Sequence, residues 1–296
     1  MGKRKVLVIG SIAVDNTIFT KKLPVAGMTT IADSFLTNIG GKGANQACAA
    51  MFLGAEVSFI GAVGNDKNGK HVEEFLEEQG LNARIKKSKL PTGVAFIILE
   101  EQTGENRILI VQGANTDIQI EDIDTNSDLF KEGDILLTQF ENSMETVQHV
   151  LKKAHDAGMK IVLNPAPIKK FDESYYKYVD YLVPNEHELE ELSGLKDPIE
   201  GAKLLLSKGA KNVIVTLGEK GSVLVNKEKI HKVNPHKVNA IDTTAAGDSY
   251  LGALVSKLAN DCDIIEAMEY ASLASSYTVT KQGAIIALPH LEDLKG

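Results

Sequence analysis

The fold is constrained most by an alternation of short, almost wholly apolar runs with longer segments of helical periodicity. The apolar runs are typical of buried strands and cover residues 6–9, 57–63, 134–138, 161–163, 181–183 and 213–216. Helical periodicity marks residues 44–53, 69–79, 144–157 and 199–208, and a glycine, which often ends a helix, follows each segment. This alternation predicts an α/β fold, a three-layer sandwich in which helices cover both faces of a mostly parallel central sheet.

Two stretches, residues 11–38 and 92–111, interrupt the alternation. Their strand-like pieces have no helices between them, and they cover residues 16–19, 30–35, 94–100 and 107–111, with a polar hairpin turn at 101–106 around Gly104. We expect a small antiparallel sheet that covers a pocket, as a lid or as a dimer surface. Because there is no internal repeat and no low-complexity linker, we expect one domain over residues 1–296.

Composition excludes two classes of protein. The chain carries a formal net charge of −8 and has no basic stripe, which argues against a nucleic-acid-binding surface. No apolar run approaches the ~20 residues that span a bilayer. Residues 6–9 are too short for a signal-peptide core, so we expect a cytoplasmic protein without membrane contact.

Cys48 and Cys262 fall in helical patterns, and we expect both to be small buried hydrophobes rather than a disulfide.

The run Asp242-Thr243-Thr244-Ala245-Ala246-Gly247-Asp248 precedes a helical pattern over residues 249–257. Small residues at a helix entrance leave backbone N–H groups uncovered, and these groups form an anion site together with the helix dipole. A carboxylate in that site suits chemistry in which a phosphate arrives beside it and the carboxylate takes a proton from the attacking group. The run therefore predicts phosphoryl transfer to an alcohol, with Asp248 as the proton acceptor.

A glycine-rich run, Gly40-Gly41-Lys42-Gly43-Ala44-Asn45, opens another helical segment. The spacing before its lysine is wrong for a phosphate-binding Walker loop, and the run is not a dinucleotide fingerprint. Its glycines would let a small polyol approach the backbone while Lys42 and Asn45 supply hydrogen bonds. An ordinary glycine turn before a helix explains the same residues equally well.

Several polar residues follow expected strands, where ligands gather in open α/β sheets. Asp15 and Glu141 can bind sugar hydroxyls there, and a turn-capping role is the alternative. Asn185 and Glu188 can hold a hydrated Mg²⁺ through water, or form an ordinary helix cap with a first-turn acid. The segment 216–221 can admit a nucleotide near its glycines or be a simple β-turn.

Taken together, these blocks resemble the ribokinase-like carbohydrate and nucleoside kinase family. The resemblance runs from Val6 to Pro289 and includes the signatures GGKGAN and DTTAAGD, with shorter family blocks at residues 113–115, 164–167, 184–186 and 216–218. It implies ATP- and Mg²⁺-dependent transfer of the γ-phosphate to a sugar hydroxyl. It also implies activation by K⁺ and a homodimer that forms through the lid sheet.

The resemblance implies a role for each matching residue. It implies that Asp248 is the catalytic base and that the backbone of Ala245, Ala246 and Gly247 is the anion hole. It implies sugar-binding positions at Asp15, Gly41, Lys42, Gly43, Asn45 and Glu141. It implies nucleotide-binding positions at Asn185, Thr216, Gly218, Gly221 and Gly247, with Glu188 near Mg²⁺. Around K⁺, mostly through the backbone, it implies Asp242, Thr244, Thr278, Lys281 and Gly283.

Two departures from the family pattern bear on the substrate and the cation. Where the family usually has an asparagine that contacts the sugar, this chain has Ala13. A missing buried polar partner costs about 1–3 kcal/mol of discrimination. We expect D-ribose as the substrate, phosphorylated at its primary O5 hydroxyl, and Ala13 raises 2-deoxyribose as the alternative. Ala287 replaces a common serine in the K⁺ loop, which puts one cation contact in doubt.

Other functions of the same fold stay open. A nucleoside kinase needs aromatic side chains around the base, and Phe19 and Phe96 in the lid pieces are candidates. A sugar-phosphate substrate needs additional arginines, and only Arg84 and Arg107 lie in suitable regions. A catalytically silent sugar sensor would not need an intact Asp248.

Overall fold

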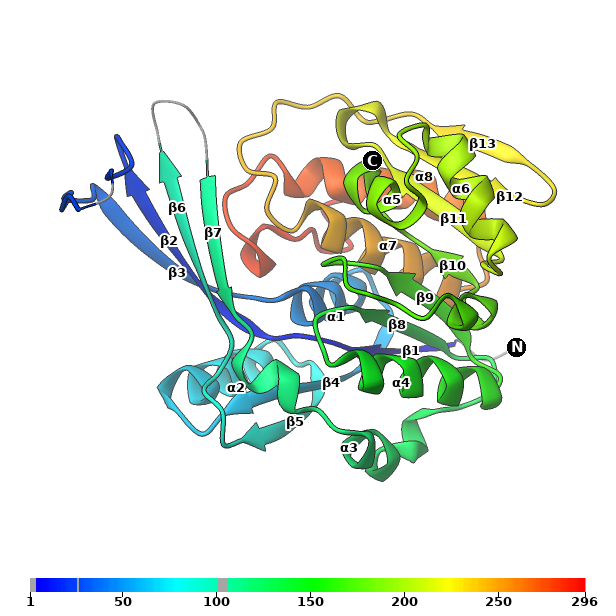
Figure 1. The fold of residues 1–296 in the computed structure, drawn as a ribbon, viewed down its shortest axis with the longest axis horizontal. Helices are drawn as coiled ribbons and strands as arrows, with labels where there is room; N and C mark the ends of the chain where they lie inside the picture. The colour runs from blue at the N-terminus through cyan, green and yellow to red at the C-terminus, as the bar shows by residue number, and fades with distance from the viewer. Residues whose placement is uncertain (1–3, 26, 101–105, 296) are drawn as a thin grey trace.

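The computed structural model describes residues 4–25, 27–100 and 106–295. The hairpin turn expected around Gly104 lies outside these residues. Nine strands of the described chain form one large sheet (Figure 1). In spatial order they are β13 (Ile230–Val233), β12 (Ser222–Asn226), β11 (Asn212–Thr216), β10 (Tyr181–Leu182), β9 (Lys160–Asn164), β8 (Ile135–Gln139), β1 (Lys5–Ile9), β4 (Glu56–Gly64) and β5 (Asn82–Ser88). Neighbours from β11 to β5 run parallel, whereas β12 and β13 extend one edge in antiparallel pairing.

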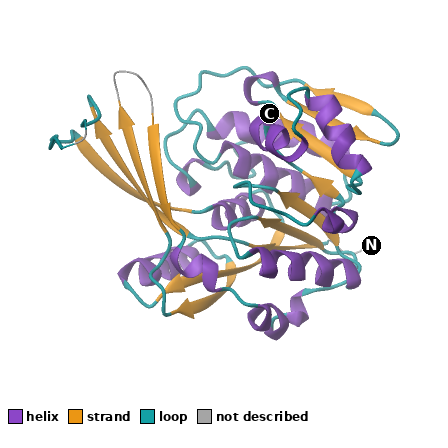
Figure 2. Ribbon diagram, viewed as in Figure 1, coloured by secondary structure: helices purple, strands orange, loops and turns teal. Residues whose placement is uncertain are grey.

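Helices cover both faces of this sheet (Figure 2). They are α1 (Lys42–Phe52), α2 (Lys67–Glu78), α3 (Ile120–Thr125), α4 (Met144–Asp156), α5 (Glu186–Ser193), α6 (Pro198–Ser207), α7 (Ala246–Ala259) and α8 (Ile264–Thr278). The described residues also contain the short 3₁₀ turns η1 (Gly113–Asp117), η2 (Ser127–Leu129), η3 (Glu173–Tyr178), η4 (Gly218–Lys220) and η5 (Ile285–Ala287). The predicted fold class is therefore confirmed.

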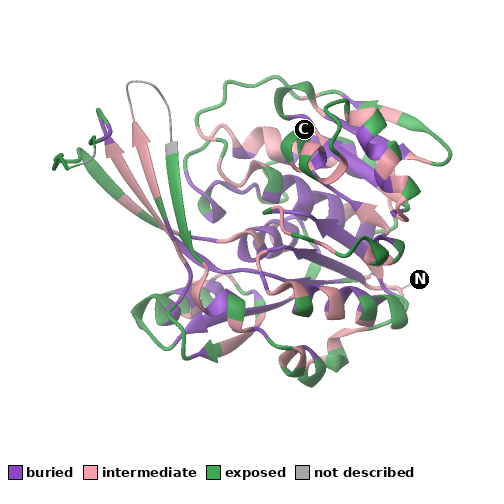
Figure 3. Ribbon diagram, viewed as in Figure 1, coloured by how far each residue is buried: buried purple, intermediate pink, exposed green. Residues whose placement is uncertain are grey.

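The hydrophobic core divides into two clusters because β-strand side chains alternate between the two faces. Val6 and Val8 of β1 belong to the cluster that packs against α1, α2, α7 and α8. Leu7 and Ile9 belong to the cluster that packs against α3, α4, α5 and α6. Figure 3 shows the central strands as the most buried part of the molecule. This rigid layer fixes the loops that leave its carboxyl edge.

A second sheet projects from that carboxyl edge as a lid (Figure 1). Its strand order is β3 (Ser34–Gly40), β2 (Ala13–Thr20), β6 (Val94–Glu100) and β7 (Asn106–Val111). The outer pairs are antiparallel, but β2 and β6 run parallel. The prediction of a wholly antiparallel lid was thus wrong, because the chain returns to the lid through a long crossover in the large domain.

Other predicted details also need correction. The second lid strand begins at Ser34 instead of residue 30, because its partner β2 ends at Thr20 and Ser34 lies opposite Phe19. Cys262 lies in the turn between α7 and α8 and is only partly buried, whereas Cys48 in α1 is fully buried.

The four predicted helix-ending glycines, Gly54, Gly80, Gly158 and Gly209, all have positive φ. Among the described residues, no helix combines the length and the apolar character needed to cross a membrane.

Candidate active site

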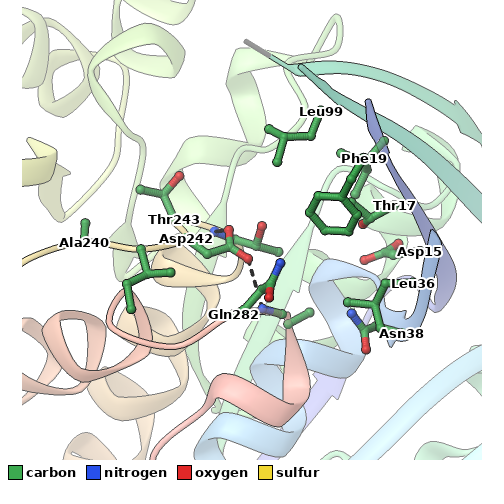
Figure 4. Close-up of a pocket in the computed structure, with 15 residues that line it drawn as sticks. Asp15, Thr17, Phe19, Leu36, Asn38, Leu99, Ala240, Asp242, Thr243 and Gln282 are labelled. Carbon is green, nitrogen blue, oxygen red and sulfur yellow. Dashed lines mark hydrogen bonds between the residues drawn. The ribbon is translucent and has the colours of Figure 1, made fainter. Parts of the chain in front are cut away.

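Two cavities open at the carboxyl edge of the large sheet. The larger, about 270 Å³, lies between the lid and the loops around Asp242 and Gly283. Figure 4 shows Thr17, Phe19 and Leu99 of the lid on one side of it, facing Asp242 and Gln282 on the other. The smaller cavity, about 220 Å³, lies at the start of α7 and includes Lys42, Asn185, Glu188, Thr216, Ala245, Ala246, Gly247 and Asp248. Because Thr243 lines both cavities, they are adjacent.

The start of α7 is built to leave backbone groups open. Ala245, the N-cap residue, adopts the left-handed conformation at φ 59°, and no side chain caps the helix. Gly247 is exposed, and a Cβ atom added to it would meet nothing within 4 Å. The N–H groups of a first helical turn have no partners within the helix, and they attract anions together with the helix dipole. The smaller cavity is therefore suited to a phosphate group.

Asp248 lies in this first turn and is only 7% exposed. Its two carboxylate oxygens are held by consecutive residues of α1. Asn45 Nδ2 donates to Asp248 Oδ2 at 2.8 Å, and Gln46 Nε2 donates to Asp248 Oδ1 at 2.9 Å. Both oxygens of the carboxylate are therefore fixed in position by side-chain amide donors. The arrangement presents a fixed proton acceptor at the wall of the smaller cavity.

Lys42 is the cation of this region. Burial alone lowers the pKa of its ammonium group, but nearby carboxylates raise it above its ordinary value, in order of size Asp248, Glu141, Glu188 and Asp15. The lysine is therefore protonated at neutral pH. It stands between the sugar side and the nucleotide side that the sequence predicted, and it lines the smaller cavity.

Asp15 and Glu141 lie on the lid side of Lys42. Asp15 lines the larger cavity, and burial raises its pKa to about 6, with smaller contributions from the charges of Glu141 and Asp248. Glu141 follows β8 and accepts hydrogen bonds from the Ser11 hydroxyl and, at 3.3 Å, from the backbone N–H of Lys42. Glu141 lines neither cavity, but its charge is close enough to raise the pKa of Asp15.

The structure explains why positions 41 and 43 are glycines. A Cβ atom on Gly41, whose φ is 91°, would lie 2.7 Å from the backbone nitrogen of Ala13. A Cβ atom on Gly43 would lie 2.5 Å from the carbonyl carbon of Gly10. Both glycines therefore allow the start of α1 to pass close to the loop that follows β1.

Asn185 and Glu188, which were predicted beside the nucleotide and Mg²⁺, form a complete capping box. The Asn185 side chain accepts from the Glu188 N–H, and Glu188 Oε2 accepts from the Asn185 N–H, both at 2.8 Å. Both residues also line the smaller cavity with Thr216, so the cap and the ligand interpretations are compatible. Burial raises the pKa of Glu188, and the charge of Asp248 adds to this.

Gly218 and Gly221 lie in the turn after β11 and are not among the residues lining either cavity. Gly221 has φ 88°, and a Cβ atom there would lie 2.1 Å from the carbonyl oxygen of Val233. Gly218 has open space around it. The packing against β13 explains Gly221, and a contact of Gly218 with a nucleotide stays a prediction.

Comparison with known proteins agrees with this geometry. The model of the pfkB family carbohydrate kinases matches residues 3–291. The chain belongs to this family. The kinase is 36% identical to a deoxyribokinase of Salmonella typhi over 97% of this chain and 96% of the relative. Its fold superimposes on ribokinase from Thermotoga maritima with a TM-score of 0.91 and 35% identity, covering 98% of this chain and 97% of that one. Ribokinase of Arabidopsis thaliana, solved with ribose and ATP, gives a TM-score of 0.88 and 29% identity, with 98% and 97% coverage.

In this kinase the Asp242 side chain links the two segments of the predicted cation loop, around Thr244 and around Gly283. Its Oδ1 accepts from the Thr244 N–H and its Oδ2 from the Gly283 N–H, both at 2.9 Å. The side chains of two other predicted K⁺ residues point to protein partners. Thr278 is fully buried and donates to Ser249 Oγ at 2.8 Å, and the Lys281 ammonium lies 4.2 Å from the Tyr277 ring centroid. Any cation contact from these two would therefore use their carbonyl oxygens.

Sequence reasoning missed two glutamines of the kinase, Gln46 and Gln139. Both are fully buried, and Gln46 contacts Asp248 directly. It also missed Asn38 and Gln282, which line the larger cavity. One signal was available for Gln46. It directly follows the glycine-rich run, on a helix whose other buried residues, apart from Asn45, are Gly, Ala or Cys.

Proposed function

We propose that this kinase transfers the γ-phosphate of ATP to the primary O5 hydroxyl of a pentose. The observation that carries the proposal is the position of Asp248, buried beside two amide donors at the open N-terminus of α7. A proton acceptor and an anion site share one cavity wall there. Two relatives support the substrate classes, since one is named deoxyribokinase and another structure holds ribose and ATP.

In the proposed reaction Asp248 accepts the proton from the sugar hydroxyl as it attacks the terminal phosphorus in line. The amides of Ala245, Ala246 and Gly247 stabilise charge on the transferring phosphoryl group, for which the Ala246 N–H exchanges its 3.2 Å hydrogen bond to the Thr243 carbonyl oxygen, and Lys42 of the same cavity adds a positive charge. Because the transition state is loose, positioning of the two reactants supplies most of the remaining acceleration. Asp15 and Glu141 hold the sugar by accepting from its other hydroxyls.

A magnesium ion fits the residues beside the smaller cavity. Among the described residues, no three His, Cys, Asp or Glu side chains come together as a metal site. Glu188 and Asp248 are the two carboxylates that line this cavity, and Mg²⁺ prefers one or two carboxylates with waters and phosphate oxygens. Glu188 would hold the ion through water, and the bound ion would neutralise phosphate charge. Loss of turnover on adding a chelator, restored by excess Mg²⁺, is the expected result.

A potassium ion near the Asp242 loop would order the residues that lead into α7. We assign its ligands to carbonyl oxygens of the loop residues Thr244, Thr278, Lys281 and Gly283, with Asp242 as the organising carboxylate. Ala287 offers no hydroxyl, so it contributes no side-chain contact. Equal turnover in Na⁺-free buffer with and without K⁺ would remove this assignment.

Within the pentoses we propose D-ribose, with 2-deoxyribose as the second candidate. Ala13, buried at the start of β2, favours the second candidate because it cannot hydrogen-bond a sugar hydroxyl. A nucleoside receives less support, because Phe19 lines the larger cavity but Phe96 does not. Arg84 gives no support to a sugar-phosphate substrate, because its guanidinium group forms a salt bridge with Asp128 at 2.6 Å.

An ATP-consumption assay separates these functions with one panel of acceptors: ribose, 2-deoxyribose, fructose, adenosine and cytidine. The proposal expects kcat/KM for one of the two pentoses to exceed the other acceptors by at least about tenfold. Preferential turnover of adenosine, cytidine or fructose would replace it with another kinase activity. Absence of ATP consumption with every acceptor would favour a sensor.

We also propose that the kinase is a homodimer through the lid. Strand register places Phe35, Phe96 and Leu109 on the lid face opposite to the side chains that line the cavity. All three are exposed, between 41% and 67%. A second copy would cover this apolar face, and such patches are usually interaction sites.

A further inference from the structure

Gln46 and Gln139 form a buried network behind Asp248 that the proposed reaction does not otherwise explain. Gln46 lies in α1 and Gln139 is the last residue of β8, and both side chains are fully buried. Gln139 Nε2 donates to Gln46 Oε1 at 2.6 Å, and Gln46 Nε2 donates to Asp248 Oδ1 at 2.9 Å. Two uncharged amides therefore connect the central sheet to the proposed base.

The direction of this network follows from one backbone acceptor. Asn164 Nδ2 donates 3.0 Å to the carbonyl oxygen of Val183, and a carbonyl can only accept. Asn164 must therefore present Oδ1 to its other neighbour, Gln46 Nε2, at 3.4 Å. With its nitrogen turned toward Asn164 and Asp248, Gln46 presents Oε1 to Gln139. The orientation of each amide is thus fixed by the next one.

The reverse orientation of Gln46 would place its oxygen against the Asp248 carboxylate, and two acceptors would then face each other. Gln139 prevents this by donating to Gln46 Oε1. Gln139 Oε1, at the inner end of the network, is buried and has no hydrogen-bond partner among the described residues. The Gln139 amide therefore directs its donor toward Gln46 and keeps its acceptor away from it.

We propose that Gln46 is a positioning residue for the phosphoryl-transfer step and that Gln139 sets the orientation of its amide. This inference rests on the proposed role of Asp248 as the base. Gln46 lines neither cavity, so it acts through the side chains that it holds, Asp248 at 2.9 Å and the cavity-lining Asn164 at 3.4 Å. Active-site groups need such support because small displacements of a reacting group lower the rate strongly.

The test is a double-mutant cycle in kcat. Gln46→Met keeps the length of the side chain and removes the donor, and we expect kcat to fall about 10- to 100-fold with the KM values for sugar and ATP within about threefold of the parent. In an Asp248→Asn background the same substitution should lower kcat less than about twofold further, because the group that it positions is gone. Gln139→Met should lower kcat less than Gln46→Met, since it frees the amide of Gln46 without removing it.

Thr138→Val is the matched control. Thr138 precedes Gln139 in β8, is 1% exposed and donates to the Ile9 carbonyl at 2.9 Å, but it has no contact with the network. It should leave kcat within about twofold. Thermal unfolding of each variant would identify any that fail to fold, and Gln139→Met then provides the second measurement.

The outcomes separate the two claims. If Asp248→Asn abolishes turnover while Gln46→Met and Gln139→Met are both as active as Thr138→Val, the positioning role is wrong and the base assignment stands. Equal losses from Gln46→Met in both backgrounds would also overturn the positioning role, because a general structural effect is additive. If Asp248→Asn keeps normal turnover, the proposed base itself is wrong.

Discussion

Asp15 is a half-buried acid that lines the larger cavity, and its pKa of about 6 lies close to neutral pH. The raised pKa means that the carboxylate is charged above about pH 6 and takes up a proton as the pH falls through that value. A charged carboxylate accepts hydrogen bonds from sugar hydroxyls better than the neutral acid does. At the residue scale, sugar binding should therefore weaken on the acid side while ATP binding does not.

We expect the KM for the sugar to rise about three- to fourfold between pH 7.5 and pH 5.5, which follows from a pKa of about 6. Steady-state kinetics with saturating ATP would measure it. Asp15→Asn is the control, since its sugar KM should be higher but independent of pH over this range. A flat sugar KM in the parent enzyme would contradict the role of Asp15.

Ala13 gives a second prediction at this scale. It is 8% exposed and lies opposite Gly40, next to the turn that begins α1. Ala13→Asn supplies a hydrogen-bonding side chain at the position where the family usually has one. The ratio of kcat/KM for ribose to that for 2-deoxyribose should rise about 5- to 100-fold. Competition between the two sugars would measure the ratio, with the KM for ATP as the control, and an unchanged ratio would show that position 13 does not select the sugar.

At the scale of elements, the start of α1 depends on a close approach of two backbones. Gly41→Ala would place a methyl group 2.7 Å from the Ala13 nitrogen in a left-handed conformation. It should lower the free energy of unfolding by at least about 2 kcal/mol. Gly218→Ala is the matched control, because Gly218 also has positive φ but open space, and it should cost about 1 kcal/mol. Urea denaturation would compare them, and equal losses would contradict the steric explanation.

The elements that the sequence predicted are those with continuous apolar runs. Strands such as β8 and β11, and helices that end at glycines, are defined by local patterns. The edge strand β5 was missed because Asn82–Ser88 is mostly polar and only partly buried. Its pairing with β4 comes from the sheet, and no local pattern encodes it. The start of α7 at Ala246 was also placed late, since Ala and Gly give no apolar periodicity.

The candidate site was predictable where chemistry and chain position coincide, as for Asp248 in its short run. Gln46 was not, because its partner Asp248 lies 202 residues away and their contact depends on the packing of α1 against α7. A buried glutamine has no distinctive local pattern. Roles that depend on such long-range contacts become visible only when the folded chain brings the residues together.

At the scale of the whole molecule, the lid face that carries Leu109 predicts the oligomeric state. Leu109→Glu places a charge on the exposed apolar face, on the edge strand β7 beside Phe96, without touching the cavity. We expect the parent to be a dimer in light scattering and the variant to be a monomer. Thr116→Glu, an exposed position outside the lid, is the control and should stay dimeric. A parent that is monomeric at micromolar concentration would contradict the proposed lid interface.

The proposed phosphoryl transfer requires Asp248 to take the proton of the sugar hydroxyl. The most direct measurement compares kcat of the parent and of Asp248→Asn under saturation, with the affinities of both substrates measured separately by calorimetry. Loss of a general base predicts a fall in kcat of about 10²- to 10⁴-fold while both affinities stay within a few-fold of the parent. Turnover of Asp248→Asn within about threefold of the parent would contradict the mechanism.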